Sequence, residues 1–523
     1  MTGRRAVGRV LAAVLGLAAA APVWAQAHAP GIVPTTDAVS QGIVGMILAT
    51  VFVLLARESA HRVLVVITAV AVLWVITYLT PFHLITFEAA KDALDLNVLL
   101  LLASMMAIVG VLKSTGVFEW GVARIMAGTG GRMAGALTLL LWFTAMLSAV
   151  ADNVTTVVFL TPMALQMAKR LNVRPVMLLL PMVMAANIGG AATLIGDPPN
   201  IMIGSGAGLS FLQFLANLTI PCAIMMIGTE WLTLRYFASD IAGARAAEPL
   251  PEASPPIHNP TLLRWSLAIS AGVLIGFLAH SYTGMPAAVP AVIGGAAVLV
   301  VQDVLYLRTR RPTEEEREHG LLAVIENEIE WPTLVFFAFL FMAVGAAVQT
   351  GLIAALAGGL SHVIHAGAAA LGLSSEGTLL FAALLILWAA GVLSGLIDNI
   401  PFVAVSIPIV AQLTGELHGD TIVLWWALAL GACLGGNSTV VGASANLTVV
   451  GIAEREGTRI TFGEFSRFGV RITVFTLLLS SAFVTAHVYT GPRGAALGGC
   501  VLLAILLLFR IAQRPRPTPV HAA

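Results

Sequence analysis

The sequence predicts an all-α polytopic membrane protein built from two inverted-topology repeats. The first observation is composition: 58% of the 523 residues are hydrophobic and only 10% are charged, whereas soluble domains carry about 25% charged residues. The second is a series of apolar stretches close to the roughly 20 residues that a helix needs to cross a bilayer. The third is a polar pattern that occurs twice, 246 residues apart. No nucleotide, dinucleotide or zinc motif accompanies them, so energy input is expected from an ion gradient or from a partner. Nucleic acid is not an expected partner.

The first 27 residues have the layout of a secretory signal peptide. Arg4, Arg5 and Arg9 precede an apolar run at 10–21, and Ala-Gln-Ala at 25–27 offers a small-residue cleavage site. An uncleaved N-terminal anchor helix is the alternative. Both interpretations place residue 30 outside, so the predicted topology does not depend on the choice.

The first membrane repeat is expected at residues 38–240 and ends at a cytoplasmic linker, 241–260. Its crossing helices are predicted at about 41–56, 63–80, 96–112, 176–203 and 216–234.

Between the third and fourth crossings lies the stretch 133–168, which Asp152 and Asn153 interrupt at its middle. Its far end carries Lys169 and Arg170. Because basic residues stay on the cytoplasmic side, this stretch must enter and leave on one face. It is therefore predicted to be a re-entrant hairpin with its tip at residues 152–153.

The second repeat, residues 261–490, follows the same scheme upside down, because an odd number of crossings starts it on the opposite face. Its hairpin tip is expected at 398–399, and an extra helix with a basic tail follows at 491–523. The prediction totals about eleven crossings and two hairpins. Beyond the N-terminal segment, only Lys91 and Arg493 then lie outside among the Lys and Arg residues, as the positive-inside rule requires.

The duplicated pattern combines an Asp-Asn hairpin tip with a stretch that breaks a helix. Aligning residues 141–200 with 387–446 without a gap gives 17 identities in 60 positions. The breaks, 196–200 and 442–446, are rich in Gly or Pro or match such a stretch by symmetry. Irregular backbone at membrane depth is tolerated only where protein or water covers it. Each repeat is therefore expected to hold a broken helix that lines an ion or substrate site and faces the hairpin tip of the same repeat.

The candidate binding groups are the polar side chains and glycines of the two tips and the two breaks. We predict ion or substrate contacts from Asp152, Asn153, Thr155, Asn187, Thr193, Gly196, Asp197, Asn200, Asp398, Asn399, Asn437, Ser438, Thr439, Gly442, Ser444 and Asn446. Oxygen ligands suit hard cations, so Na⁺ sites are predicted at Asp152, Asn153 and Asn200 and at Asp398, Asn399 and Asn446. No catalytic residue and no cofactor is expected beyond Na⁺ or H⁺ as the coupling ion.

Several of these residues also have a purely structural interpretation. Asp152 and Asp398 can serve as helix N-caps, and Asp197 beside two prolines can serve as a turn residue. The glycine pairs 189–190 and 435–436 can serve close helix packing. Ser and Thr hydroxyls in membrane helices often bond back to their own helix.

At these residues the sequence resembles the ion transporter superfamily, and within it the branch of the P protein and arsenite-pump-like permeases with a citrate-transporter-like domain. The resemblance covers roughly residues 40 to 490 and is most specific from Asn187 to Asn200. It implies inverted repeats, re-entrant hairpins, a homodimer and elevator-type movement. Sodium-coupled dicarboxylate relatives carry Ser-Asn-Thr at the hairpin tips, where this chain has Ala-Asp-Asn and Ile-Asp-Asn. The acidic tips favour cation/proton exchange over transport of a dianion.

The leading hypothesis is therefore a secondary active Na⁺/H⁺-type antiporter, a multi-pass protein of a bacterial-type inner membrane whose partners are lipid and a small ion. An arsenite or organic-anion transporter is the nearest alternative. An intramembrane aspartyl protease using Asp152 and Asp398 is a remote one, because such enzymes need both acids on neighbouring crossing helices. A passive ion channel is a further alternative, because residue types do not show whether the movement of one ion is coupled to that of another.

Overall fold

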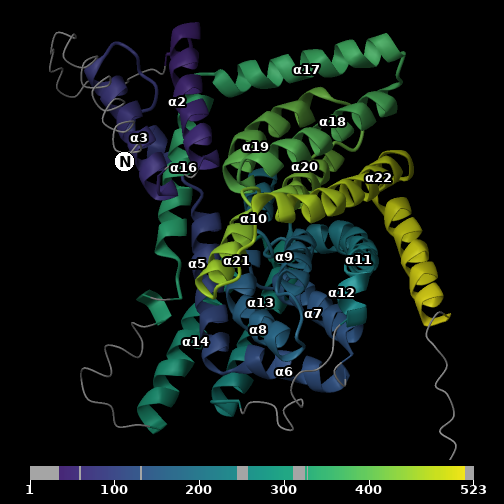
Figure 1. Cartoon of the computed structure of the whole chain (residues 1–523). Helices are drawn as coiled ribbons and strands as arrows, with labels where there is room; N and C mark the ends of the chain where they lie inside the picture. The colour runs from purple at the N-terminus through teal and green to yellow at the C-terminus, as the bar shows by residue number, and fades with distance from the viewer. Residues whose placement is uncertain are drawn as a thin grey trace, which may run out of the picture.

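The computed structural model describes residues 35–57, 60–129, 132–243, 257–309, 324–326 and 328–512. Every regular element in these ranges is a helix (Figure 1). The predicted N-terminal signal or anchor, residues 1–27, lies outside the described ranges, as do most of the 241–260 linker and the end of the basic tail.

Ten helices of the described ranges are long and apolar enough to cross a membrane. In the first repeat these are α2 (Ala38–Ala56), α3 (Arg62–Leu79), α5 (Leu96–Ser114) and α11 (Phe211–Tyr236). In the second they are α13 (Pro260–Thr283), α14 (Ala288–Thr309), α16 (Trp331–Gln349), α17 (Leu352–Leu371), α18 (Ser375–Leu396) and α22 (Phe462–Ala512). Gly491, with φ of 70°, divides α22 into two helices, and the second of them is the predicted extra C-terminal helix.

Both predicted helix breaks are present. The stretch 176–203 consists of α9 (Val176–Ala191) and α10 (Pro198–Ala207), which Pro198 can begin because the first turn of a helix needs no N–H partner. The equivalent segment consists of α20 (Ile422–Gly435), a short 3₁₀ turn η1 (Gly436–Ser438) and α21 (Ser444–Arg455). The second break thus forms without proline, as the symmetry of the pattern predicts.

The two hairpins have matching caps at their tips. Helix α7 (Met133–Ser148) turns into α8 (Asn153–Arg170), and α18 turns into α19 (Asn399–Glu416). Asp152 caps α8 by accepting from the Thr155 N–H at 2.8 Å, and Asp398 caps α19 by accepting from the Ile400 N–H at 3.0 Å. The capping role suggested for these aspartates is therefore part of what they do.

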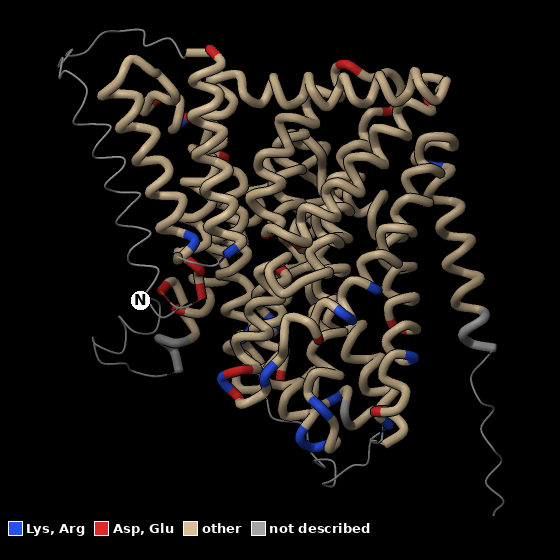
Figure 2. The backbone as a smooth tube through the Cα atoms, turned by 45° about the horizontal axis from the view of Figure 1, so that its top comes forward, with Lys and Arg blue, Asp and Glu red and all other residues tan. Residues whose placement is uncertain are grey.

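The repeats are related by inversion. Helix α5 packs on α14 as α16 packs on α3, and each second hairpin arm packs on the broken helix of the other repeat, α8 on α21 and α19 on α10. Helix α6 (Val117–Thr129) lies at one end of the molecule, and α17 lies across the opposite end (Figure 1). Most Lys and Arg residues gather toward the end opposite α17 (Figure 2), as predicted for a cytoplasmic face.

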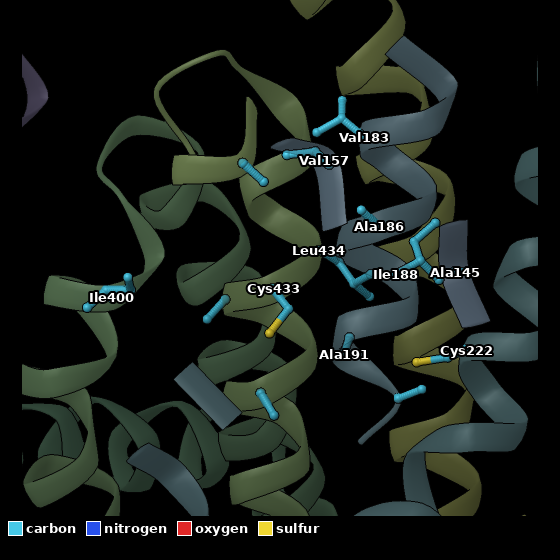
Figure 3. Packing of buried hydrophobic residues seen from close by; sticks show 14 of the residues in the cluster. Ala145, Val157, Val183, Ala186, Ile188, Ala191, Cys222, Ile400, Cys433 and Leu434 are labelled. Carbon is cyan, nitrogen blue, oxygen red and sulfur yellow. The ribbon is translucent and has the colours of Figure 1, made fainter. Parts of the chain in front are cut away.

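The centre of the molecule is formed by α9, which is buried along its whole length, and by α20, which is buried except at its first residue. Small and apolar side chains of α7, α9 and α20 meet there, among them Ala145, Ile188 and Leu434 (Figure 3). A Cβ on Gly189 would overlap the backbone of Ala145, and one on Gly435 would overlap the backbone of α18. The first glycine of each pair therefore serves close packing of the broken helix on its hairpin, and the second, Gly190 or Gly436, packs against the break itself, at Gly196 or Gly442.

Candidate functional site

Three carboxylates lie at the two hairpin tips and the first helix break, and they interact through their charges. Asp197, in the first break, is 1% exposed, and Asp152 at the first tip is 8% exposed. Both Asp152 and Asp398 act electrostatically on Asp197, which also faces the Cys433 thiol and the Asn153 amide. One Asp197 carboxylate oxygen has no hydrogen-bond partner. An unpartnered buried oxygen in an acidic cluster is suited to receive a proton or a cation.

The two tip aspartates hold their hydroxyl partners differently. Asp152 accepts a hydrogen bond from Thr155 on its own helix, whereas Asp398 accepts from Ser444 on the second break at 2.7 Å. In the gapless alignment Thr155 matches Pro401, and Ser444 matches Pro198. Each aspartate thus keeps one hydroxyl donor, but only Asp398 is tied by it to a broken helix.

A cluster of buried amides joins the two repeats. Asn187 accepts from the Asn153 amide at 3.1 Å and donates to Asn437 and Asn446 at 2.8 and 3.1 Å. All four side chains are at most 3% exposed. The sequence placed each tip against the break of its own repeat, and the link from Asn187 to the opposite repeat was not foreseen. Cys433 stands where a matching amide would be, so this cluster has no second copy.

Asn200 and Asn446 brace the breaks. Asn200 donates to the carbonyls of Gly190, Ala191 and Thr193 at 3.2, 3.3 and 2.9 Å. Asn446 donates to the carbonyls of the second break at 2.8 Å. These amides satisfy backbone oxygens that the broken helices leave free. The Na⁺ coordination predicted for both residues stays a prediction, and in this structure each oxygen already accepts from Cys433 or Asn187.

The remaining predicted side chains hold the local backbone or lie beside the tips. Thr193 and Thr439 donate to carbonyls at the end of the first arm of their own hairpin, and each accepts from the glycine N–H of its break, Gly196 or Gly442. Ser438 donates back to its own turn. Asn399 is 3% exposed next to Asp398.

A pocket of about 370 Å³ leads to this site between α3, α16 and the second break. Its polar lining residues are His61, Arg62, Glu330, Asp398, Ser444 and Thr448. The first three were not among the predicted site residues. Arg62 in particular counted only as one of the basic residues that mark the cytoplasmic side. Within the described ranges, no group of three or more His, Cys, Asp or Glu residues could hold a metal ion.

The comparisons with known proteins point in one direction. The profile of the citrate transporter family CitMHS matches residues 50–431. An uncharacterised transporter of Mycobacterium tuberculosis is 36% identical over 84% of this chain and 96% of its own length. The P protein of Sus scrofa is 30% identical over 86% of this chain and 60% of its own length. The crystal structure of the Alcanivorax borkumensis YdaH transporter has a TM-score of 0.54 and 16% identity, over 83% of this chain and 100% of that one. This last likeness concerns the fold alone.

Proposed function

Because the chain belongs to the citrate transporter family and is a membrane transporter, we propose that it is a secondary active antiporter exchanging a small cation, Na⁺ or Li⁺, for protons. The observation that carries the proposal is that Asp152 and Asp398, at the two tips, both act electrostatically on the buried Asp197 of the first break, and one oxygen of Asp197 has no hydrogen-bond partner. The sequence predicted each tip against the break of its own repeat, whereas the action of Asp398 on Asp197 crosses between the repeats.

Charge balance is the physical reason. An ionised carboxylate costs roughly 2.5–3.5 kcal/mol at the centre of a membrane helix on insertion scales, and neighbouring carboxylates repel one another. The cluster is stable when a proton or a cation neutralises it. Proton and cation are then alternative occupants of the same oxygens. Such competition is sufficient for exchange once the site opens alternately to the two sides of the membrane.

We place the movement between two groups of helices. The pairs α5–α14 and α3–α16 form one group, and the hairpins with the broken helices form the other. The second group carries all three aspartates and would move as a unit in an elevator-type step, with both hairpins re-entrant. The resemblance extends the proposal to a homodimer. The gathering of basic residues at one end supports an orientation with that end on the cytoplasmic side of an inner membrane (Figure 2).

Transport of a citrate-like organic anion is the second candidate. The family profile is described as that of citrate transporters, and Arg62 brings a guanidinium into the pocket beside Asp398. Guanidinium groups bind carboxylates with two parallel hydrogen bonds. The acidic cluster opposes this reading, because it repels a free dianion.

The test is a transport assay in proteoliposomes that contain the purified protein, a trapped pH dye and an imposed proton gradient. NaCl, LiCl, KCl, citrate and arsenite are added in turn. We expect Na⁺ or Li⁺ to collapse the gradient. Asp152→Asn and Asp398→Asn should abolish the response while the protein elutes normally from a sizing column. Asp240→Asn, at an ion pair with Arg174 outside the site, is the matched control and should exchange normally.

Two results would overturn the proposal. Wild-type exchange in Asp152→Asn or Asp398→Asn would remove that carboxylate from the mechanism. Uptake of citrate or arsenite without any response to cations would establish the anion transporter instead.

A further inference from the structure

A single guanidinium joins the two groups of helices at the mouth of the pocket. Arg62, the first residue of α3, donates to the Thr333 hydroxyl of α16 at 2.9 Å and to the Ser444 hydroxyl of α21 at 3.2 Å. Thr333 donates onward to Glu330 at 2.9 Å, and Ser444 donates onward to Asp398 at 2.7 Å. A continuous chain of hydrogen bonds therefore runs from α16 through Arg62 to the second hairpin tip.

The chain delivers positive charge to Asp398. Ser444 accepts from the guanidinium and donates to the carboxylate, so its dipole is aligned between opposite charges, an arrangement that strengthens both bonds. Arg62 also acts on Asp398 directly through its charge, and its guanidinium lies 5.8 Å from the Phe336 ring centre. The other titratable groups that line the pocket are His61 and Glu330.

Within the ranges that the structure describes, the first tip has no equivalent cation. Asp152 takes its hydroxyl partner from its own helix, and the charge that acts on it from the start of α16 is that of the acid Glu330. The inverted fold places the start of α14 against α5, where α3 meets α16. There Ala288 donates its backbone N–H to Asn97 at 2.8 Å, and Asn97 donates to Ser205 at 3.3 Å. This link is neutral, so charge acts at only one of two related positions.

We propose that Arg62 is a coupling residue that stands in for the transported cation. While the site is empty, its guanidinium neutralises Asp398 through Ser444 and ties α21 to α3 and α16. When a cation or proton takes over that neutralisation, the tie weakens and the group that carries Asp398 is released. The identity of the ion rests on the proposed function, whereas the tie between α21 and α3 does not.

The electrostatic part of the proposal, neutralisation of Asp398 by Arg62, is tested by measuring the cation concentration that gives half-maximal exchange. Arg62→Gln removes the competing charge, so this concentration should fall by about tenfold, the range of a hydrogen bond to a charged group. Arg62→Lys keeps the charge and should stay near wild type. Arg57→Gln is the matched control, because Arg57 is exposed at the end of α2. An unchanged concentration in Arg62→Gln overturns the proposal.

The mechanical part of the proposal, the tie between α21 and α3, is tested at a different pocket from the one that Arg62 lines. A second pocket, of about 220 Å³, lies beside α10 and is lined by Leu209, which is 8% exposed. In a Leu209→Cys protein that also carries Cys500→Ser, a membrane-impermeant maleimide reports opening of this pocket, since Cys222 and Cys433 are buried. Breaking the tie should populate the alternative state and raise the labelling rate about threefold or more.

Arg62 lines the first pocket and Leu209 lines the second, and the two pockets share no lining residue. A faster labelling rate in Arg62→Gln therefore reports movement of the helices and not simple exposure of position 209. An unchanged rate overturns the proposal. Ser444→Ala, which removes the α21 end of the tie, repeats the labelling test if Arg62→Gln fails to fold. Wild-type protein that exchanges no cation refutes the proposed function, and the labelling rate alone then decides whether Arg62 ties the two groups.

Discussion

Replacing Asn187 with alanine should separate the two repeats at their centre. Asn187 is fully buried and makes three amide hydrogen bonds, to Asn153 of the first hairpin and to Asn437 and Asn446 of the second break. In Asn187→Ala three polar atoms lose these partners in a region from which water is excluded. A hydrogen bond between membrane helices is worth about 0.6 kcal/mol on average. The expected loss is therefore about 2 kcal/mol of unfolding free energy.

The assay is thermal unfolding of the purified protein in detergent, paired with the exchange assay in proteoliposomes. Asn217→Ala is the control, because the half-buried Asn217 amide donates to the Gln213 carbonyl of its own helix, and its effect should stay within about 0.5 kcal/mol. Asn187→Cys copies the residue of the second repeat and should lose as much stability as Asn187→Ala.

The exchange rate of Asn187→Ala should fall by about tenfold or more. The reason is that loss of the Asn187 amide displaces the side chains around the three carboxylates, in addition to destabilising the fold. Equal melting temperatures for Asn187→Ala and Asn217→Ala, with wild-type exchange in both, would refute the reasoning that the amide cluster holds the repeats together.

Three further predictions concern packing, a buried acid and a surface pair. Gly435→Ala should destabilise the protein by about 1–3 kcal/mol through overlap with α18, whereas Gly358→Ala, where no atom lies within 4 Å, should be neutral or stabilising in the same unfolding assay. Glu230, which is 4% exposed and accepts hydrogen bonds from a threonine and a tryptophan of α7, should tolerate replacement by Gln better than by Ala, by about 1–3 kcal/mol; equal losses would contradict this. Arg174→Gln breaks the ion pair with Asp240 and should cost at most about 1 kcal/mol, a difference that disappears in high salt.

Much of the fold was open to prediction because its signals are local. Apolar length marks the crossing helices, the Asp-Asn tips begin α8 and α19, and Pro198 with Pro199 forces the first break within a few residues. The second break, which contains no proline, was predicted only through the duplication. Membership in the wider transporter group was predicted from the run between Asn187 and Asn200, and the family comparisons confirm it.

The residues of the site were predicted better than the contacts that they make. Asp152 and Asp398 do act electrostatically on Asp197, yet Asn200, predicted as an ion ligand, braces the backbone, and Thr193 holds its break to its hairpin. Arg62 was assigned only to the cytoplasmic side, although it reaches the second break. The Na⁺ sites, the antiport, the elevator step and the homodimer remain predictions.

By itself, the sequence determined where helices cross, turn back and break, because dihedral preferences, capping and apolar length act within a few residues. Only the tertiary structure decided that Asn187 bonds to Asn437 and that Arg62 is linked to Asp398 through Ser444. Each of these partners lies about 250 residues or more from the other along the chain. Such contacts depend on how two inverted repeats pack against each other, and no local preference of either segment specifies that packing.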